Sequence, residues 1–208
     1  NLAVNRKRAG SNVAIVDLDL VNPYFRTREA RMTLADLGIK VILPAEQYLQ
    51  ADLPILSPSI AGMIRNSRDL LILDVGGDDA GATVLSSLAD AFSDKRVHML
   101  QVVNPLRPQT STVSGCLTMR SEIEKAAQLT ITGLIGNANL IDETSAEDIY
   151  SGYEFVQNVS QEGGLPLEFI TVSQELLPKI NMKRFSCAVL PIARQLVPPW
   201  LKVNEFRN

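Results

Sequence analysis

Several residue types are scarce in this sequence of 208 residues, and each scarcity excludes a class of protein. There are two cysteines, Cys116 and Cys187, and a single histidine. Two lone thiols exclude a disulfide-stabilised scaffold, and they favour a reducing, cytoplasmic location. No apolar run approaches the roughly 18 residues that a membrane-spanning helix needs. We therefore expect a cytoplasmic protein with no transmembrane segment.

An excess of positive charge is also missing. The chain carries 20 basic and 23 acidic residues, and its formal net charge is -3. This balance argues against a dedicated nucleic-acid or membrane-surface protein, because such proteins usually carry a strong basic excess. The length and the hydrophobic content of 46% suit an ordinary α/β domain with a sizeable core.

Short β-rich segments alternate with segments of helical periodicity along the chain. We predict strands over 12–18, 39–43, 70–75, 97–103, 130–135 and 167–172, and helices over 1–9, 80–92, 110–128 and from Thr144 onwards. From Glu175 to the end we expect helical or irregular structure. Alternation of this kind predicts an α/β fold, a doubly wound and mostly parallel sheet with helices on both faces.

The most informative stretch is the apolar run from Leu70, which leads directly into Asp74. Ligands of open α/β sheets bind at the carboxyl ends of the strands, where Asp74 is expected. Gly76 and Gly77 allow a sharp turn and a close approach to a ligand. Asp74, Asp78 and Asp79 together suit a hard cation or an ordered water. The alternative is a buried strand followed by an ordinary acidic turn.

A second polar loop follows the strand predicted over 12–18. Asp17 and Asp19 come first, and Arg26 and Arg28 follow. The acids at i and i+2 point the same way if the chain stays extended. The loop could position a metal ion or a water and bring its arginines to a phosphate. The alternative is a solvated turn whose arginines are either solvated or paired with acids.

Amides and a further arginine follow two later strands. Asn104 and Arg107 come after the strand over 97–103, and Asn137 and Asn139 come after the strand over 130–135. Because the carboxyl ends of parallel strands meet at one edge of a sheet, we expect all these polar loops to converge there.

Three segments together carry a resemblance to a known family. Val16-Asp17-Leu18-Asp19, Leu73-Asp74-Val75-Gly76-Gly77 and Gly133-Leu134-Ile135-Gly136-Asn137 occur in this order. The set resembles the MinD/ParA/Mrp branch of the P-loop NTPases, which includes CobQ/CobB-type proteins, and the resemblance extends to about residue 175. It implies a Mg²⁺-dependent ATPase that acts as a switch, forms a nucleotide-dependent homodimer and passes a conformational change to a protein partner.

The resemblance also implies roles for individual residues. The family's water-activating acid falls on Asp19, and its magnesium-holding acid falls on Asp74, with Asp17 beside the magnesium. The adenine-contacting asparagine falls on Asn137, with Asn139 close by, and Arg107 is a further candidate for cofactor binding. Phosphoryl transfer relies on charge neutralisation and an aligned water, which suits such a set.

The family's phosphate-binding loop with Gly-Lys-Ser/Thr is absent, and no Gly-Lys pair occurs anywhere in the sequence. We expect one nucleotide-binding domain over residues 1–208, whose N-terminal strand and phosphate-binding loop precede Asn1 in a longer protein. Two alternatives stay open. One is a non-catalytic scaffold or binding protein that keeps the fold without this loop, and the other is a phospho-acceptor domain that uses Asp74.

Overall fold

The computed structural model describes residues 1–19, 27–43, 58–67 and 70–196. The chain divides into two compact units. The first comprises residues 1–97, 126–128 and 194–208, and the second comprises residues 98–125 and 129–193. Each unit has its own parallel sheet, and the prediction of a single domain over 1–208 stays a prediction.

The sheet of the first unit has the strand order β2-β1-β3. Its strands are β1 (Val13–Asp17), β2 (Lys40–Ile42) and β3 (Leu70–Asp74), and both pairings are parallel. The register places Asp17 directly opposite Asp74. Two carboxylates therefore end neighbouring strands at the same edge of this sheet.

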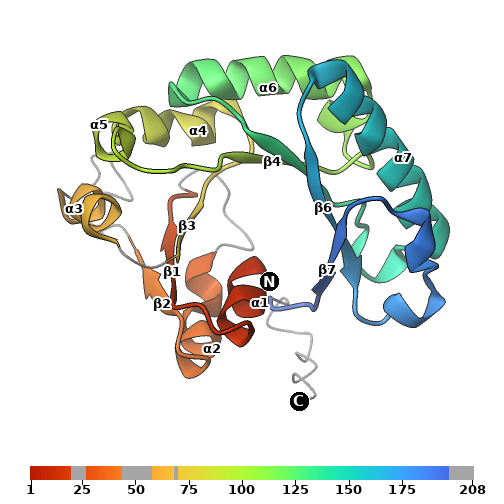
Figure 1. Ribbon diagram of the computed structural model, residues 1–208, viewed down its shortest axis with the longest axis horizontal. Helices are drawn as coiled ribbons and strands as arrows, with labels where there is room; N and C mark the ends of the chain where they lie inside the picture. Colours follow the sequence, from red (N-terminus) through yellow and green to blue (C-terminus); the bar gives the residue numbers. More distant parts are fainter. Residues whose placement is uncertain (20–26, 44–57, 68–69, 197–208) are drawn as a thin grey trace. The chain divides into compact units, whose positions relative to one another are not determined.

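The helices of the first unit lie on both sides of this sheet (Figure 1). They are α1 (Leu2–Arg8), η1 (Thr27–Ala30), α2 (Arg31–Asp36), α3 (Pro58–Asn66), α4 (Asp79–Ser86) and α5 (Ala89–Phe92). One buried cluster joins Val4 of α1, Val13 and Ile15 of β1, and Leu34 of α2. This packing holds β1 in place and thereby positions Asp17 at its end.

The sheet of the second unit has the strand order β4-β5-β6-β7, and all three pairings are parallel. Its strands are β4 (Leu100–Val103), β5 (Gly133–Gly136), β6 (Leu167–Ser173) and β7 (Ala188–Ile192). Short 3₁₀ turns precede α6 and α7 and connect β6 to β7, at η3 (Pro108–Thr110), η4 (Ile141–Glu143), η5 (Leu177–Lys179) and η6 (Met182–Arg184).

Two long helices cover the sheet of the second unit, α6 (Val113–Ala127) and α7 (Ala146–Gly163). Cys116 of α6 and Val156 of α7 share one buried cluster with Val103 and Leu134 of the strands. Burial raises the pKa of the Cys116 thiol to about 11, so this cysteine is an inert core residue.

The first turn of α7 corrects a detail of the sequence prediction. The helix begins with a capping box in which Ser145 is the N-cap and Asp148 is its partner, and Thr144 lies outside it. The helix predicted from residue 110 likewise begins later, at Val113, and the hydroxyl of Thr112 accepts from the amide of Gly115. Neighbouring hydroxyl residues compete for a cap, and geometry selects among them.

The predicted α/β class is confirmed, with parallel sheets flanked by helices. Two elements differ from the prediction. The helix expected over 80–92 is broken into α4 and α5. At the break, the hydroxyls of Ser86 and Ser87 donate to backbone carbonyls of the preceding turn of α4, and such side-chain bonds compete with helical backbone hydrogen bonds. Strand β7 was expected as helical or irregular sequence. Within the ranges that the structure describes, no helix is long and apolar enough to cross a bilayer.

Candidate functional site

The first group of site residues lies at the carboxyl edge of the β2-β1-β3 sheet. Asp17 and Asp74 are the last residues of β1 and β3. The chain leaves β1 still paired to β3, because the amide of Leu18 donates to the carbonyl of Asp74 over 2.7 Å. The amide of Asp19 donates to Asp17 Oδ1 over 3.2 Å. The structure thus brings Asp17, Asp19 and Asp74 together, as the sequence predicts.

Arg28 is the counter-ion of Asp17. Its Nε donates to Asp17 Oδ2 and its Nη2 to Oδ1, both over 2.9 Å. The Asp17 side chain is fully buried, whereas that of Arg28 is 17% exposed. The hydrogen bond with Asp17 raises the pKa of Arg28 above its ordinary value. Of the two interpretations offered for this arginine, the structure favours pairing with an acid. Arg26 lies outside the described residues.

Asp74 has a neutral partner. The hydroxyl of Thr27, the first residue of η1, donates to Asp74 Oδ2 over 2.5 Å. Burial raises the pKa of Asp74, and the charges of Asp17 and Asp19 add to the rise, while the Thr27 hydrogen bond opposes it. A carboxylate in this position gains from a positive charge, so its environment suits a cation.

The glycines after β3 serve a close approach of two backbone segments. A Cβ on Gly76 would lie 2.8 Å from the Cα of Gly81, and it would also meet Asp19 Oδ1 at 3.4 Å. Gly77 has nothing within 4 Å of such an atom. The predicted sharp turn is therefore present, and Gly76 lets the end of β3 pack against the first turn of α4.

The predicted acidic cluster of Asp74, Asp78 and Asp79 is not a metal site in this structure. Asp78 is the N-cap of α4 and accepts from the amide of Gly81 over 2.8 Å. Asp79 Oδ1 accepts from the amide of Ala80. Among the described residues, no three His, Cys, Asp or Glu side chains are grouped to hold a metal ion. The two later aspartates act as helix-start residues instead.

The second group of site residues lies at the carboxyl edge of the β4-β5-β6-β7 sheet. Asn137 follows β5, and its Oδ1 accepts from the hydroxyl of Thr171 on β6 over 2.6 Å. Its backbone amide donates to the carbonyl of Val103 over 2.8 Å. Since the oxygen of the Asn137 amide is engaged, its nitrogen is the end suited to contact a ligand.

Asn139 performs a structural task in the same loop. Its carbonyl accepts from Nδ2 of Asn104 over 2.9 Å, which ties together the loops after β4 and β5. Its Oδ1 accepts from the amide of Ile141 over 2.6 Å. Ile141 has a φ of 62°, an unusual conformation for a β-branched residue, and the Asn139 contact helps to hold it. Arg107 is exposed on the loop after β4.

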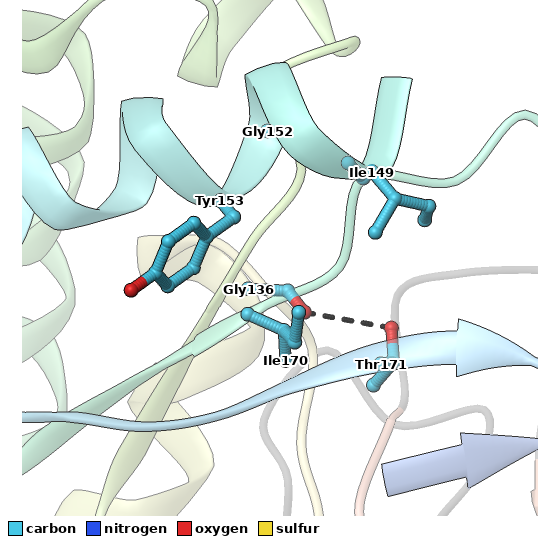
Figure 2. Close-up of a pocket in the computed structure, with 7 residues that line it drawn as sticks. Gly136, Ile149, Gly152, Tyr153, Ile170 and Thr171 are labelled. Atoms are coloured by element: carbon cyan, nitrogen blue, oxygen red, sulfur yellow. Dashed lines mark hydrogen bonds between the residues drawn. The ribbon is translucent and has the colours of Figure 1, made fainter. Parts of the chain in front are cut away.

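A small pocket lies between α7 and strands β5 and β6 (Figure 2). Figure 2 shows Thr171 pointing towards the carbonyl of Gly136, to which its hydroxyl donates over 3.4 Å. The side chains of Ile149, Tyr153 and Ile170 give the pocket a mostly apolar wall. The cavity volume is about 10 Å³, roughly the room that one water needs and far below the roughly 300–1,000 Å³ of ligand pockets. This pocket alone does not accommodate a nucleotide.

Sequence reasoning missed two residues, Thr27 and Thr171. Thr27 donates its hydroxyl to Asp74, and Thr171 donates its hydroxyl to Asn137. Thr27 directly precedes Arg28, so the candidate arginine was the signal in the sequence that pointed to this segment. Thr171 lies in the middle of β6. Predicting its contact with Asn137 would require the register between β5 and β6, which the sequence of one strand does not reveal.

Comparisons with known proteins give no family. No family model and no curated protein matches the sequence. Two solved structures have a similar arrangement of the chain at low identity. One is D-threo-3-hydroxyaspartate dehydratase from Delftia sp. HT23, at 14% identity and a TM-score of 0.43, with 90% of this chain and 56% of that chain covered.

The other structure is a nucleotide-binding protein from Archaeoglobus fulgidus in complex with ADP. Its identity is 21% and its TM-score 0.44, with 85% of this chain and 76% of that chain covered. The chain thus spans little more than half the length of the dehydratase and about three quarters of the length of the nucleotide-binding protein. At these levels of similarity, neither match establishes a function.

Proposed function

We propose that this protein binds ATP together with Mg²⁺ and hydrolyses it, and that it acts as a dimeric switch of the MinD/ParA type. One observation carries the proposal: Asp17 and Asp74 end neighbouring parallel strands in register, with Asp19 two residues beyond. A pair of strand-end acids at the edge where α/β sheets bind ligands is suited to a metal–phosphate site. The phosphate-binding loop expected ahead of Asn1 stays a prediction.

Mg²⁺ needs few protein carboxylates. It usually takes one or two of them and completes its shell with waters and substrate phosphates. In this proposal Asp74 holds the ion, and Asp17, whose two oxygens accept from Arg28, lies beside it. The ion would neutralise charge on the phosphates.

Asp19 is the proposed group for orienting the attacking water. It follows the anchored end of β1, and its Oδ1 lies beside Gly76 at the end of β3. A carboxylate fixed in this way could accept a hydrogen bond from a water in line with a phosphate.

Asn137 is the proposed contact for the base of the nucleotide. The hydroxyl of Thr171 holds its oxygen, so its amide nitrogen can donate to a ring nitrogen. Asn139 would support this loop through Asn104, and the exposed Arg107 is the candidate for a phosphate contact. We further propose a cytoplasmic location, a nucleotide-dependent homodimer and an as yet unknown protein partner.

Isothermal titration with MgATP and with ATP in EDTA tests the binding step on the full-length protein. We expect binding that requires Mg²⁺, and its loss in Asp74→Asn. The matched control is Asp36→Asn, which makes the same change at an exposed position at the end of α2. Equal affinities of wild type and Asp74→Asn would remove Asp74 from the site.

Phosphate release tests the chemical step. In Asp19→Asn we expect turnover to fall by about 10²–10⁴-fold, the range typical of general acid–base groups, while MgATP still binds. Normal turnover in this variant would refute the role of Asp19. If the full-length wild type binds no nucleotide, a non-catalytic scaffold becomes the better description.

A further inference from the structure

The turn formed by Thr27 and Arg28 contacts both strand-end carboxylates, but in two different ways. Arg28 donates three hydrogen bonds to the Asp17 carboxylate, from its backbone amide over 2.8 Å and from Nε and Nη2 over 2.9 Å. Nη2 also donates to the carbonyl of Asp19 over 2.8 Å. Arg28 therefore anchors the turn to the end of β1 and to the residue beyond it.

The ion pair between Arg28 and Asp17 is energetically costly to break. The Asp17 side chain is fully buried, and a buried carboxylate without its counter-ion is strongly unfavourable. The bidentate geometry satisfies both of its oxygens at once. A cation that arrives at this edge would have to displace a guanidinium from a buried partner, and we expect the ion pair to persist instead.

The contact with Asp74 has the opposite character. It consists of one hydrogen bond from a neutral hydroxyl, on a side chain that is partly buried. Asp17 and Asp19 lie close enough to repel its charge. Thr27 thus supplies a dipole where a full positive charge would be more favourable.

We propose that Thr27 is a displaceable occupant of Asp74: a divalent cation held by this carboxylate competes with the Thr27 hydroxyl, while Arg28 keeps the turn anchored through Asp17. The inference rests on the proposed function, in which Asp74 holds the cation. A hydroxyl that donates to Asp74 Oδ2 directs its proton to the region that the cation needs, and the two positive ends repel each other. When the cation binds, the Thr27–Arg28 turn loses the hydrogen bond between Thr27 and Asp74.

Titration with Mn²⁺ alone tests this competition, with free Mn²⁺ followed by electron paramagnetic resonance on the full-length protein. In Thr27→Val the competing donor is gone, and we expect Mn²⁺ to bind roughly threefold to tenfold more tightly than to wild type, within the range of the net contribution of a typical intramolecular hydrogen bond. Thr27→Ser keeps the hydroxyl and should match wild type. Thr33→Val, the same change at an exposed position of α2, should also match it.

The outcomes separate this inference from the proposed function. If Asp74→Asn abolishes Mn²⁺ binding but Thr27→Val leaves the affinity unchanged, the competition is refuted and the cation site stands. Weaker binding by Thr27→Val would also refute it, because Thr27 would then assist the cation. If Asp74→Asn binds Mn²⁺ like wild type, or if neither wild type nor Thr27→Val binds it, both the cation site and the competition fail.

Discussion

Asp17 can remain charged without any exposure to water because one side chain compensates it. The guanidinium of Arg28 meets both carboxylate oxygens and is itself largely covered. In such a pair the cost of removing one partner exceeds the gain of having both, since the remaining charge is left buried. The ion pair therefore controls the conformation around the site more than it adds to net stability.

Arg28→Met should lower the free energy of unfolding by about 3–5 kcal/mol, the cost of leaving one charge of a buried pair uncompensated. Urea denaturation measures it. Asp17→Asn combined with Arg28→Met removes both charges and should recover a large part of the loss. Additive losses in the double variant would show that the two residues do not act as a pair.

Asp74 should make stability depend on pH in a predictable direction. Its pKa is raised in the folded protein above the value of about 3.9 for an unperturbed aspartate. The folded state then binds more protons between the two pKa values, so stability falls as the pH rises through that interval. The charged form consequently costs stability at pH 7.

We expect Asp74→Asn to be more stable than wild type at pH 7, because the amide can still accept from Thr27 and carries no charge. The difference should shrink as the pH falls and should vanish well below about 3.9, where wild-type Asp74 is protonated in both states. Urea denaturation at several pH values, without added divalent cations, measures this trend. A variant less stable than wild type at pH 7 would contradict the assigned cause.

At the scale of helices and strands, apolar runs made the edge of each sheet predictable. The run that begins at Leu70 identified β3, and Asp74 then marked its end. The hydroxyl partners were not predictable, because the Thr27–Asp74 contact joins segments far apart in the chain. Strand β7 was missed for a similar reason: it is stabilised by pairing with β6, and local sequence records little of such pairing.

Close packing of α7 on the loop after β5 depends on Gly152. A Cβ at this position would lie 2.3 Å from the Cβ of Ala138, whereas at Gly62 in α3 nothing would lie within 4 Å. Gly152→Ala should thus destabilise by about 1–3 kcal/mol through overpacking, even though alanine favours helices. Gly62→Ala should stabilise by up to about 1 kcal/mol through helix propensity. Thermal unfolding of the two variants should shift in opposite directions; shifts in the same direction would contradict this account.

At the scale of the whole molecule, a ligand that binds only the folded state should stabilise it. With MgATP at 100 times its dissociation constant, the gain is about 2.7 kcal/mol. Differential scanning fluorimetry should show a higher unfolding midpoint for wild type and for Asp36→Asn, but not for Asp74→Asn. An unfolding midpoint of the full-length wild type that stays the same with saturating MgATP would contradict the proposed function.

The parallel register of β1 and β3 also has a kinetic consequence. Parallel strands cannot be joined by a tight turn, and here α2, β2 and α3 all lie between the two strands in the chain. Bringing Asp17 opposite Asp74 therefore closes a long loop, which costs entropy before any contact compensates it. We expect the carboxylate edge to assemble late, with φ-values near zero at both aspartates. The nascent chain would then lack a cation site until the sheet that carries it has already formed.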